Sequence, residues 1–272
     1  MTARNDLRDR LRVKPGTRVS LASVDPAATH GHDKAGATKA TTAVLIRLSD
    51  LQERLWAEHR HKVLIVLQGI DAAGKGGTIE HVMGAFNPAG ATVTSFKVPT
   101  EPERDHDYLW RVHQHTPGSG QIAVFDRSHY EEVLIVRVHA LVAEEVWSRR
   151  YDQINAFEQT LAEEGTTILK FFLYIDRDEQ RERFQARYDD PTKRWKFRMG
   201  DLDERKRWDD YIAAFEDVLS RTSTKHAPWY LIPANRKWFR NLAVATIVAD
   251  TLSDLAPAYP IDPTLPEGLI VE

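Results

Sequence analysis

Val63-Leu64-Ile65-Val66-Leu67-Gln68 runs directly into Gly69-Ile70-Asp71-Ala72-Ala73-Gly74-Lys75-Gly76-Gly77-Thr78. The apolar, β-branched run favours a buried strand, and the residues from Thr78 onward have the pattern of a helix start. A glycine-rich turn with one lysine between a strand and a helix is the setting in which this spacing cradles phosphate. Backbone N–H groups, the helix N-terminus and the charge of Lys75 all favour an anion there. The stretch predicts a phosphate-binding loop formed by Gly69, Ala72, Ala73, Gly74, Lys75, Gly76, Gly77 and Thr78. The alternative is a surface turn.

The residue after Lys75 departs from the usual pattern. A Ser or Thr normally stands there and its hydroxyl holds Mg²⁺, whereas this chain has Gly76 and places Thr78 two residues later. Asp71 lies inside the loop, where a carboxylate would repel phosphate unless a cation lay between them. We therefore interpret Asp71 as a ligand of a metal ion, or of a metal-bound water, that replaces the missing hydroxyl. The alternative is an Asp that bonds locally to the backbone of a turn.

Length and composition restrict the class of protein. A chain of 272 residues with 42% hydrophobic content is ample for one α/β domain. Its formal net charge of −3 gives no general attraction to nucleic acid or to an anionic membrane, so neither is expected as a partner. The chain has no cysteine, which excludes disulfides and cysteine-based metal sites and fits a cytoplasmic location. No stretch approaches transmembrane length, and the polar start of the chain does not have the pattern of a signal peptide.

Strand and helix patterns alternate along most of the chain. We expect an extended N-terminal arm over residues 1–40, a single domain over 41–256 and a proline-containing tail over 257–272. Within the domain, strands are expected at 63–68, 92–96, 121–125, 166–175 and 229–232. Helices are expected at 41–58, 77–86, 103–115, about 143–164, 177–188, 203–222 and 236–255. This alternation predicts a three-layer α/β/α fold with a mainly parallel sheet.

A second strand ends in a carboxylate. The apolar run of residues 121–125 is followed by Asp126 and Arg127. A carboxylate at the end of a strand that neighbours a phosphate loop can reach its Mg²⁺, and an arginine beside it can bind phosphate bidentately. Taken alone, Asp126 would more simply form a turn or cap a helix. Together with the upstream loop, the metal-binding interpretation is the better one.

A basic stretch lies late in the chain. Residues 181–207 hold ten basic and six acidic side chains, a net charge of +4 on an otherwise acidic protein. The segment 189–202 has the composition of a loop between two helices. A helix, a basic loop and a second helix after a late strand is where P-loop kinases place a lid over phosphates. An ordinary solvated pair of charged helices is the alternative.

These stretches together resemble the polyphosphate kinase 2 family, and within it class III. The resemblance runs from about Leu11 to Pro260. It is carried by residues 68–78, 125–131, 134–139, 155–158, 195–197, 208–211, 227–230 and 235–239. At Gly76, class III members often have an acidic residue, and Gly-Gly after the lysine is commoner in other classes. The Ser128-His129-Tyr130-Glu131 stretch points back to class III.

The resemblance implies a P-loop kinase-like fold with a two-helix lid at about 178–222. It implies a cytoplasmic phosphotransferase that moves phosphate between inorganic polyphosphate and AMP, ADP or ATP, with guanine nucleotides as further candidates, and that forms homodimers or homotetramers. By the same resemblance Asp71 and Asp126 bind Mg (or Mn), and Lys75 and Arg127 contact the transferring phosphates. The lid cations that would hold a phosphate chain are Arg183, Arg187, Lys193, Arg194 and Lys196.

The chemistry of such a transfer fits the residues. The acceptor is a phosphate oxygen that is already anionic near neutral pH, so the difficulty lies in bringing two polyanions together. A metal on two carboxylates and a cationic lid would compensate that charge. An ATP-dependent nucleotide or nucleoside kinase uses the same parts and is the alternative enzyme. A non-catalytic nucleotide-binding switch or a nucleic-acid-associated P-loop protein is the alternative outside enzymes.

Overall fold

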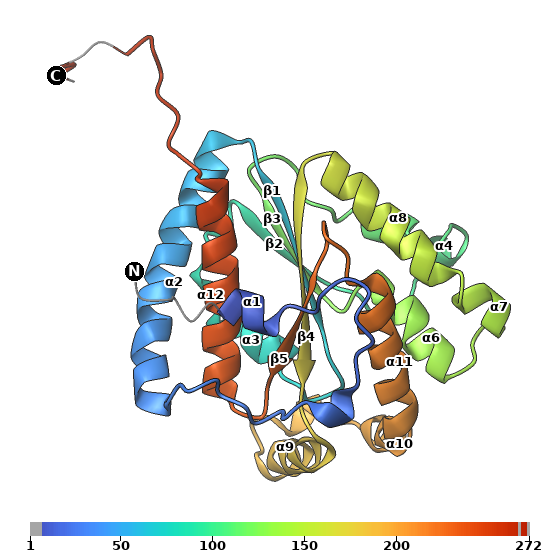
Figure 1. Ribbon diagram of the computed structural model, residues 1–272. Helices are drawn as coiled ribbons and strands as arrows, with labels where there is room; N and C mark the ends of the chain where they lie inside the picture. The colour runs from blue at the N-terminus through green and yellow to red at the C-terminus, as the bar shows by residue number, and fades with distance from the viewer. Residues whose placement is uncertain (1–6, 266–267, 271–272) are drawn as a thin grey trace.

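Five strands form one sheet at the centre of the molecule: β1 (Lys62–Gln68), β2 (Ala91–Ser95), β3 (Ile122–Asp126), β4 (Thr166–Tyr174) and β5 (Trp229–Pro233). A computed structural model describes residues 7–265 and 268–270. The strand order is β2-β3-β1-β4-β5, and every neighbouring pair is parallel (Figure 1). All five strands therefore end at the same edge of the sheet, with β1 in the middle.

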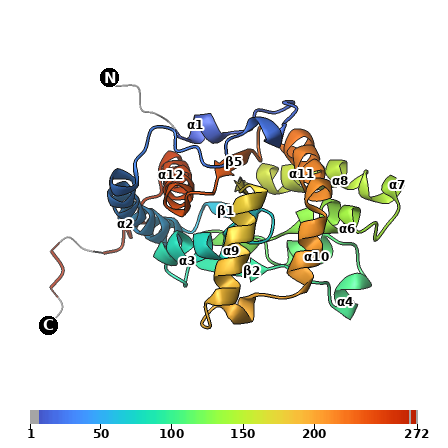
Figure 2. The same cartoon turned by 90° about the horizontal axis from the view of Figure 1, so that it is seen from below.

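Helices cover both faces of this sheet. On one face lie α2 (Lys34–Glu58), α3 (Lys75–His81) and α12 (Lys237–Leu255), and on the other α6 (Ile135–Val138), α8 (Arg150–Glu163) and α11 (Trp208–Thr222) (Figures 1 and 2). Strands that are buried on both faces consist of continuous apolar runs, and six consecutive residues of β1 are buried. The predicted three-layer α/β/α fold with a parallel sheet is confirmed.

Two helices lie across the carboxyl ends of the strands. They are α9 (Arg177–Asp189) and α10 (Gly200–Lys206), joined by a loop that contains the 3₁₀ turn η4 (Arg194–Lys196). In the view of Figure 2 they lie over the end of the sheet. The predicted helix 203–222 is in fact two helices, α10 and α11, separated at Arg207. α9 and α10 thus form a pair of helices around an exposed basic loop, whereas α11, which the predicted lid of about 178–222 also includes, lies on one face of the sheet.

The N-terminal arm lies against the main domain. It contains α1 (Leu7–Leu11) and the 3₁₀ turn η1 (Leu21–Ser23), and it runs beside β5. The N–H of Val13 donates to the carbonyl of Trp229 at 2.9 Å, and Arg12 forms an antiparallel bridge with Tyr230. The arm covers the edge of the sheet at β5, which would otherwise offer unpaired backbone groups to another chain.

The first long helix begins earlier than predicted. α2 starts at Lys34 rather than at 41, so the last part of the expected extended arm is helical. Asp33 caps it, and its side chain accepts a hydrogen bond from the N–H of Gly36 at 2.9 Å. Residues 34–40 lack large apolar side chains at helical spacing, so periodicity does not reveal this part of the helix. Asp33, a favourable N-cap residue, is the feature of the sequence that indicates where the helix begins. Residues 1–6 of the arm and residues 266–267 and 271–272 of the tail lie outside the described residues.

Three other predicted helices are shorter or broken. The helix expected at 103–115 is two short helices, α4 (Glu101–Arg104) and α5 (Trp110–His113). The side chain of Asp107 accepts from the N–H groups of Leu109 and Trp110 between them, and this local turn competes with a continuous helix. The helix expected at about 143–164 is likewise divided into α7 (Glu144–Trp147) and α8, while the helix expected at 77–86 spans α3 and the 3₁₀ turn η2 (Met83–Ala85).

Among the described helices, none combines the length and the apolar character needed to cross a membrane.

Candidate active site

The loop between β1 and α3 has a backbone that requires glycine at two points. A Cβ at Gly69 would lie 2.7 Å from the carbonyl oxygen of Leu173, and one at Gly74 would lie 1.9 Å from Nη1 of Arg240. Gly74 is also the N-cap of α3, with a φ of 112°. Because a helix leaves its first N–H groups without an intrahelical partner, those of Lys75, Gly76 and Gly77 can serve an anion. This loop, residues 69–78, is called the P-loop below.

Lys75 folds back over the P-loop. Its Nζ donates to the carbonyl of Gly69 at 2.6 Å. Burial lowers the pKa of Lys75, and the nearby Arg127 cation lowers it further, while Asp71, Asp126 and Glu131 raise it. These four charged side chains thus lie close enough to act on the lysine, and the pairing of Asp126 with Leu67 of β1 places this strand end beside the P-loop. Thr78 is buried, and its hydroxyl donates to the Gly74 carbonyl at 3.2 Å.

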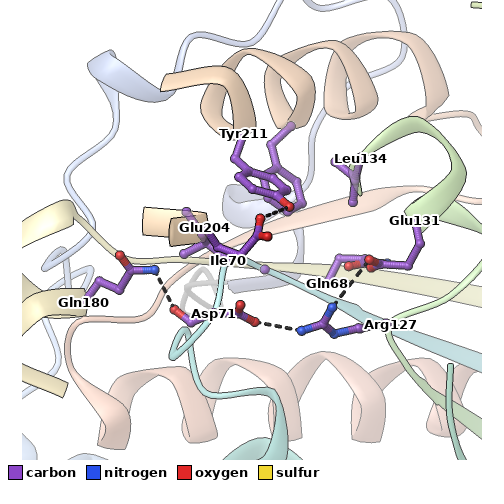
Figure 3. Close-up of a pocket in the computed structure, with 11 residues that line it drawn as sticks. Gln68, Ile70, Asp71, Arg127, Glu131, Leu134, Gln180, Glu204 and Tyr211 are labelled. Atoms are coloured by element: carbon purple, nitrogen blue, oxygen red, sulfur yellow. Dashed lines mark hydrogen bonds and ion pairs between the residues drawn. The ribbon is translucent and has the colours of Figure 1, made fainter. Parts of the chain in front are cut away.

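Arg127 lies between two carboxylates (Figure 3). Its Nη2 is 2.7 Å from Oδ1 of Asp71, and its Nη1 is 3.6 Å from Oε2 of Glu131. Burial alone would lower the pKa of Arg127, but the carboxylates around it, Glu131 first, raise it. The Arg127 backbone has a φ of 63°, in the left-handed region, and its N–H donates to the carbonyl of Leu67 at 3.1 Å. This backbone conformation is unfavourable for a residue with a Cβ, and it directs the guanidinium of Arg127 toward the P-loop.

Asp126 has an unused buried oxygen. In the sheet, Asp126 of β3 is paired with Leu67 of β1. This pairing places Asp126 beside the start of the P-loop. Oδ2 accepts from the hydroxyl of Ser95 at 3.3 Å, whereas Oδ1 is buried and has no hydrogen-bond partner among the described residues. A buried carboxylate oxygen without a donor is costly unless a ligand uses it.

The donors present fit a hard divalent cation. Carboxylate oxygens are the ligands that Mg²⁺ prefers, and it commonly uses one or two of them together with water and substrate phosphates. In residues 7–265 and 268–270 no group of three or more His, Asp or Glu side chains forms a ready-made metal site. Asp71 and Asp126 therefore suit a cation that arrives with, or is completed by, phosphate oxygens. Asp71 would have to give up part of its ion pair with Arg127.

The predicted lid cations are placed in three different settings. Arg183 is buried behind the P-loop, where its guanidinium is bonded to protein oxygens. Arg187 is partly buried; burial lowers its pKa, and Asp201 and Asp71 act on it as opposing charges. The remaining three, on the exposed loop between α9 and α10, are Lys193, Arg194 and Lys196.

The exposed lid cations have only local contacts. Lys193 pairs with Asp190 at 2.7 Å, Nε of Arg194 donates to the carbonyl of Tyr188 at 2.7 Å, and Nζ of Lys196 lies 5.0 Å from the ring centre of Trp195. Such exposed contacts are weak, so these side chains can exchange them for a phosphate chain at little cost.

The residues after Arg127 are held by a buried polar network. Glu158 on α8 accepts from the hydroxyl of Tyr130 at 2.8 Å and contacts Nε2 of His129 at 3.2 Å. Nζ of Lys170 on β4 pairs with Glu158 and donates to Tyr130 and to the carbonyl of Thr222. Burial opposes the charge on Glu158, but Lys170 and His129 together lower its pKa. The network fixes the turn that carries Arg127 and Glu131.

Sequence patterns did not single out several residues at this site. Glu131 is a partly buried carboxylate whose pKa is raised by burial. Gln180 on α9 donates to the carbonyl of Asp71 at 3.0 Å. Arg240 on α12 lies beside Gly74, and burial together with the charge of Arg183 lowers its pKa to about 10. The sequence feature that could have identified Arg240 is its position as a single arginine within the otherwise apolar pattern of α12.

A pocket adjoins the P-loop on the side of the lid (Figure 3). Tyr211 donates to Glu204 at its rim, at 2.7 Å. The lining residues come from β1 and the P-loop, the turn after β3, and the lid helices with α11: Gln68, Gly69, Ile70, Asp71, Arg127, Glu131, Leu134, Gln180, Glu204, Tyr211 and Phe215. Asp71 and Arg127 thus line the same pocket as Gln180 of α9 and Glu204 of α10. The other predicted metal-binding carboxylate, Asp126, is not among the described residues that line it.

Comparison with known proteins gives a consistent result. A family model described as Polyphosphate kinase 2 (PPK2) matches residues 31–259. A protein of Meiothermus ruber named AMP/ADP-polyphosphate phosphotransferase is 52% identical over 263 residues, which is 96% of this chain and 98% of that protein. An ADP-polyphosphate phosphotransferase of Rhodopseudomonas palustris is 49% identical over 226 residues, covering 79% of this chain and 78% of that one.

A solved structure shares the fold. The crystal structure of polyphosphate kinase 2 from Arthrobacter aurescens TC1 superposes with a TM-score of 0.91 at 45% sequence identity. The match covers 94% of this chain and 92% of that chain. The fold of most of the chain is therefore similar to that of a solved polyphosphate kinase 2.

Proposed function

The chain belongs to the polyphosphate kinase 2 family, and we propose that it is a class III member that transfers the terminal phosphate of inorganic polyphosphate to AMP and ADP, reversibly. The observation that carries this proposal is the meeting of Asp71, Lys75, Asp126 and Arg127 at one sheet edge. They do so in a chain 52% identical to a named AMP/ADP-polyphosphate phosphotransferase along nearly its whole length. The pocket beside them is lined in part by Gln180 of α9 and Glu204 of α10.

Each residue of the site has its own role in an in-line transfer. The attacking group is a phosphate oxygen of the acceptor nucleotide, so no side chain has to remove a proton from it. Lys75 and Arg127 place positive charge where two polyanions approach each other, and the P-loop amides orient the phosphates. Glu131 holds Arg127 in place from the far side.

Asp71 and Asp126 would hold a divalent ion, Mg (or Mn), in this proposal. When bound, the ion would supply positive charge that compensates the negative charge of the phosphate groups. The unpartnered Oδ1 of Asp126 supports this use. Calorimetric titration of Mn²⁺ into the enzyme with ADP present tests it: Asp71→Asn and Asp126→Asn should each weaken binding.

The donor chain is proposed to follow the lid. A long polyanion needs a series of cations rather than a single pocket. The end of α9 and the loop after it offer such a series in Arg187, Lys193, Arg194 and Lys196. Their exposed or partly exposed positions support this role.

The decisive experiment supplies polyphosphate as the sole donor. Purified protein is incubated with Mg²⁺, polyphosphate and one of AMP, ADP, GMP or GDP, and the products are separated by chromatography. ADP and ATP should form from AMP, and ATP from ADP. Transfer that occurs only when ATP is the donor would instead identify a nucleotide kinase.

Assembly and location belong to the same proposal. We expect a homodimer or homotetramer in the cytoplasm, with no nucleic acid or membrane partner, on the strength of the family alone. Light scattering of the purified chain gives the number of subunits directly, and a monomeric mass would contradict the expected assembly.

A further inference from the structure

Arg183 uses its entire guanidinium group on protein oxygens. Its Nε donates to Glu179 at 2.7 Å, and its Nη1 donates to the carbonyls of Ala72 and Ala73 at 2.9 and 2.8 Å. Its Nη2 donates to the carbonyls of Ala234 and Asn235 at 2.6 and 3.2 Å. A guanidinium has five N–H donors, so these five bonds leave none for a phosphate. The side chain is 8% exposed.

Gln180, one helical turn before Arg183, also binds a carbonyl of the P-loop. Nε2 of Gln180 donates to the carbonyl of Asp71 at 3.0 Å. Gln180 and Arg183 are three residues apart and share one face of α9. Between them they bind the carbonyls of three consecutive P-loop residues: Asp71, Ala72 and Ala73.

Holding those carbonyls orients the amides that follow them. In a trans peptide the C=O and the next N–H point in opposite directions. The N–H groups of Ala72 and Gly74 are therefore turned away from α9, while that of Ala73 closes a turn on the carbonyl of Ile70. Ala72 has a φ of 66°, a conformation that a residue with a Cβ adopts only when its surroundings hold it.

We propose that Arg183 is a positioning residue that locks the P-loop in its phosphate-binding form, with Gln180 as its helper, and is not itself a ligand of the polyphosphate chain. Through Ala234 and Asn235 it also ties the P-loop to the segment between β5 and α12, so the base of the lid is a fixed part of the site. This role rests on the proposed function, and it separates Arg183 from Arg187, one turn further along α9.

Substitution of Arg183 by lysine distinguishes a residue that binds phosphate from one that clamps the P-loop by binding its carbonyl groups. Lysine binds phosphate well as a point charge, but its three donors on one atom cannot span four carbonyls and a carboxylate. We expect Arg183→Lys to lose as much turnover as Arg183→Gln, about 100-fold in kcat, because misplaced amides act on the transition state. Arg187→Lys should stay within about tenfold of the parent. Arg181→Gln, an exposed change on the same helix, is the matched control and should leave kcat unchanged.

Hydrogen exchange tests the same inference without any substrate. In Arg183→Gln, peptides spanning the P-loop and residues 234–240 should exchange at least about tenfold faster than in the parent, and peptides from α8 should not change. This result stands even if the parent proves inactive with polyphosphate, so the clamp and the proposed function can fail separately. If Arg183→Gln does not fold, Glu179→Ala removes only the Nε partner and should give the same pattern at smaller amplitude.

Two results would overturn the inference. One is an Arg183→Lys enzyme with parental kcat and parental P-loop exchange. The other is an Arg183→Gln enzyme in which only the KM for polyphosphate rises while kcat and exchange are unchanged, the behaviour of a direct donor contact.

Discussion

At the scale of single residues, the site contains charges that oppose one another until a ligand arrives. Arg127 pairs with Asp71 across 2.7 Å, and one oxygen of Asp126 is buried with no donor in the part of the chain that the structure describes. If Asp71 binds the metal ion as we propose, its ion pair with Arg127 reduces the affinity of the empty enzyme for a free cation. The arrangement therefore favours a cation that arrives already bound to phosphate, since the phosphate can draw Arg127 away from Asp71.

Replacing Asp126 separates function from stability. In Asp126→Asn we expect kcat to fall by about 100-fold or more, because the side chain loses the charge that a metal ion requires. The free energy of unfolding should change by less than about 1 kcal/mol, because the buried Oδ1 has no bond to lose. Steady-state kinetics and urea denaturation measure both quantities. Asp152→Asn, on the exposed side of α8, serves as control, and near-parental activity of Asp126→Asn would refute the assignment.

Removing the guanidinium should have opposite effects on metal binding and on catalysis. In Arg127→Gln, Asp71 loses its cationic partner, so Mn²⁺ affinity without nucleotide is expected to rise, by up to about tenfold. Turnover should fall, since the transferring phosphate loses its bidentate partner. Calorimetry gives the affinity. Arg54→Gln, which breaks an Arg–Asp pair on the surface of α2, should leave it unchanged, and a drop in Mn²⁺ affinity in Arg127→Gln would count against the competition between arginine and metal.

At the scale of elements, one face of α9 contributes to the active site in two different ways. It is packed behind the P-loop through Gln180 and Arg183, and Arg187 begins the cationic series that continues into the loop before α10. The same helix thus supports the phosphate loop and, in the proposed function, also offers charge to the donor. The exposed contacts of Lys193 and Arg194 leave the outer part of the lid free to rearrange.

The outer lid cations should act on the donor more than on the fold. Arg187→Ala and Lys193→Ala are each expected to raise the KM for polyphosphate about three- to tenfold, since each removes one partly screened charge. The KM for ADP and the melting temperature should change little. Added salt should reduce the difference from the parent. Unchanged donor kinetics in both variants would move the donor path away from this loop.

At the scale of the whole molecule, one buried ion pair connects distant parts of the chain. Lys170 of β4 and Glu158 of α8 are both fully buried, and their bonds reach the turn after Arg127 and the end of α11 at Thr222. The network lies behind the site and joins the sheet to the helices of one face. The catalytic turn therefore depends on the integrity of the core.

Breaking that pair should be costly. Lys170→Met leaves the Glu158 carboxylate buried without its cation, and we expect a loss of about 3–5 kcal/mol in the free energy of unfolding. Lys206→Met breaks an exposed pair with Asp203 and should cost less than about 1 kcal/mol. Urea denaturation of both variants measures the difference. A small loss in Lys170→Met would show that the carboxylate is neutral or that water reaches it.

The pair also sets a dependence on acid. The pKa of Glu158 is lowered from 4.5 in the folded chain, where Lys170 and His129 outweigh the effect of burial. Below about pH 4.5 the unfolded chain binds the proton first, so this contribution to stability is complete above that pH and is lost as the pH falls toward the folded pKa. Glu158→Gln should flatten the acid side of the stability curve. A parental acid slope in that variant would assign the effect to other carboxylates.

Much of the fold could be predicted because its signals are local. The apolar run of β1, the glycine spacing of the P-loop and the alternation of strands with helices each lie within a short stretch of chain, and all five strands were expected close to their observed positions. The errors were also local: the cap at Asp33 and the turn at Asp107 compete with helix periodicity over three or four residues.

The sequence by itself determined the chemistry of the site: a phosphate loop with Lys75, and carboxylates in Asp71 and Asp126. Only the tertiary structure decided how side chains of the same kind differ. Arg183 and Arg187 stand one turn apart in one helix, yet one is clamped to carbonyls while the other is partly exposed. The ion pair of Asp71 with Arg127 joins residues 56 positions apart. The physical reason is that an arginine takes its role from the oxygens that surround it, and those are set by how helices and loops pack, which no local pattern specifies.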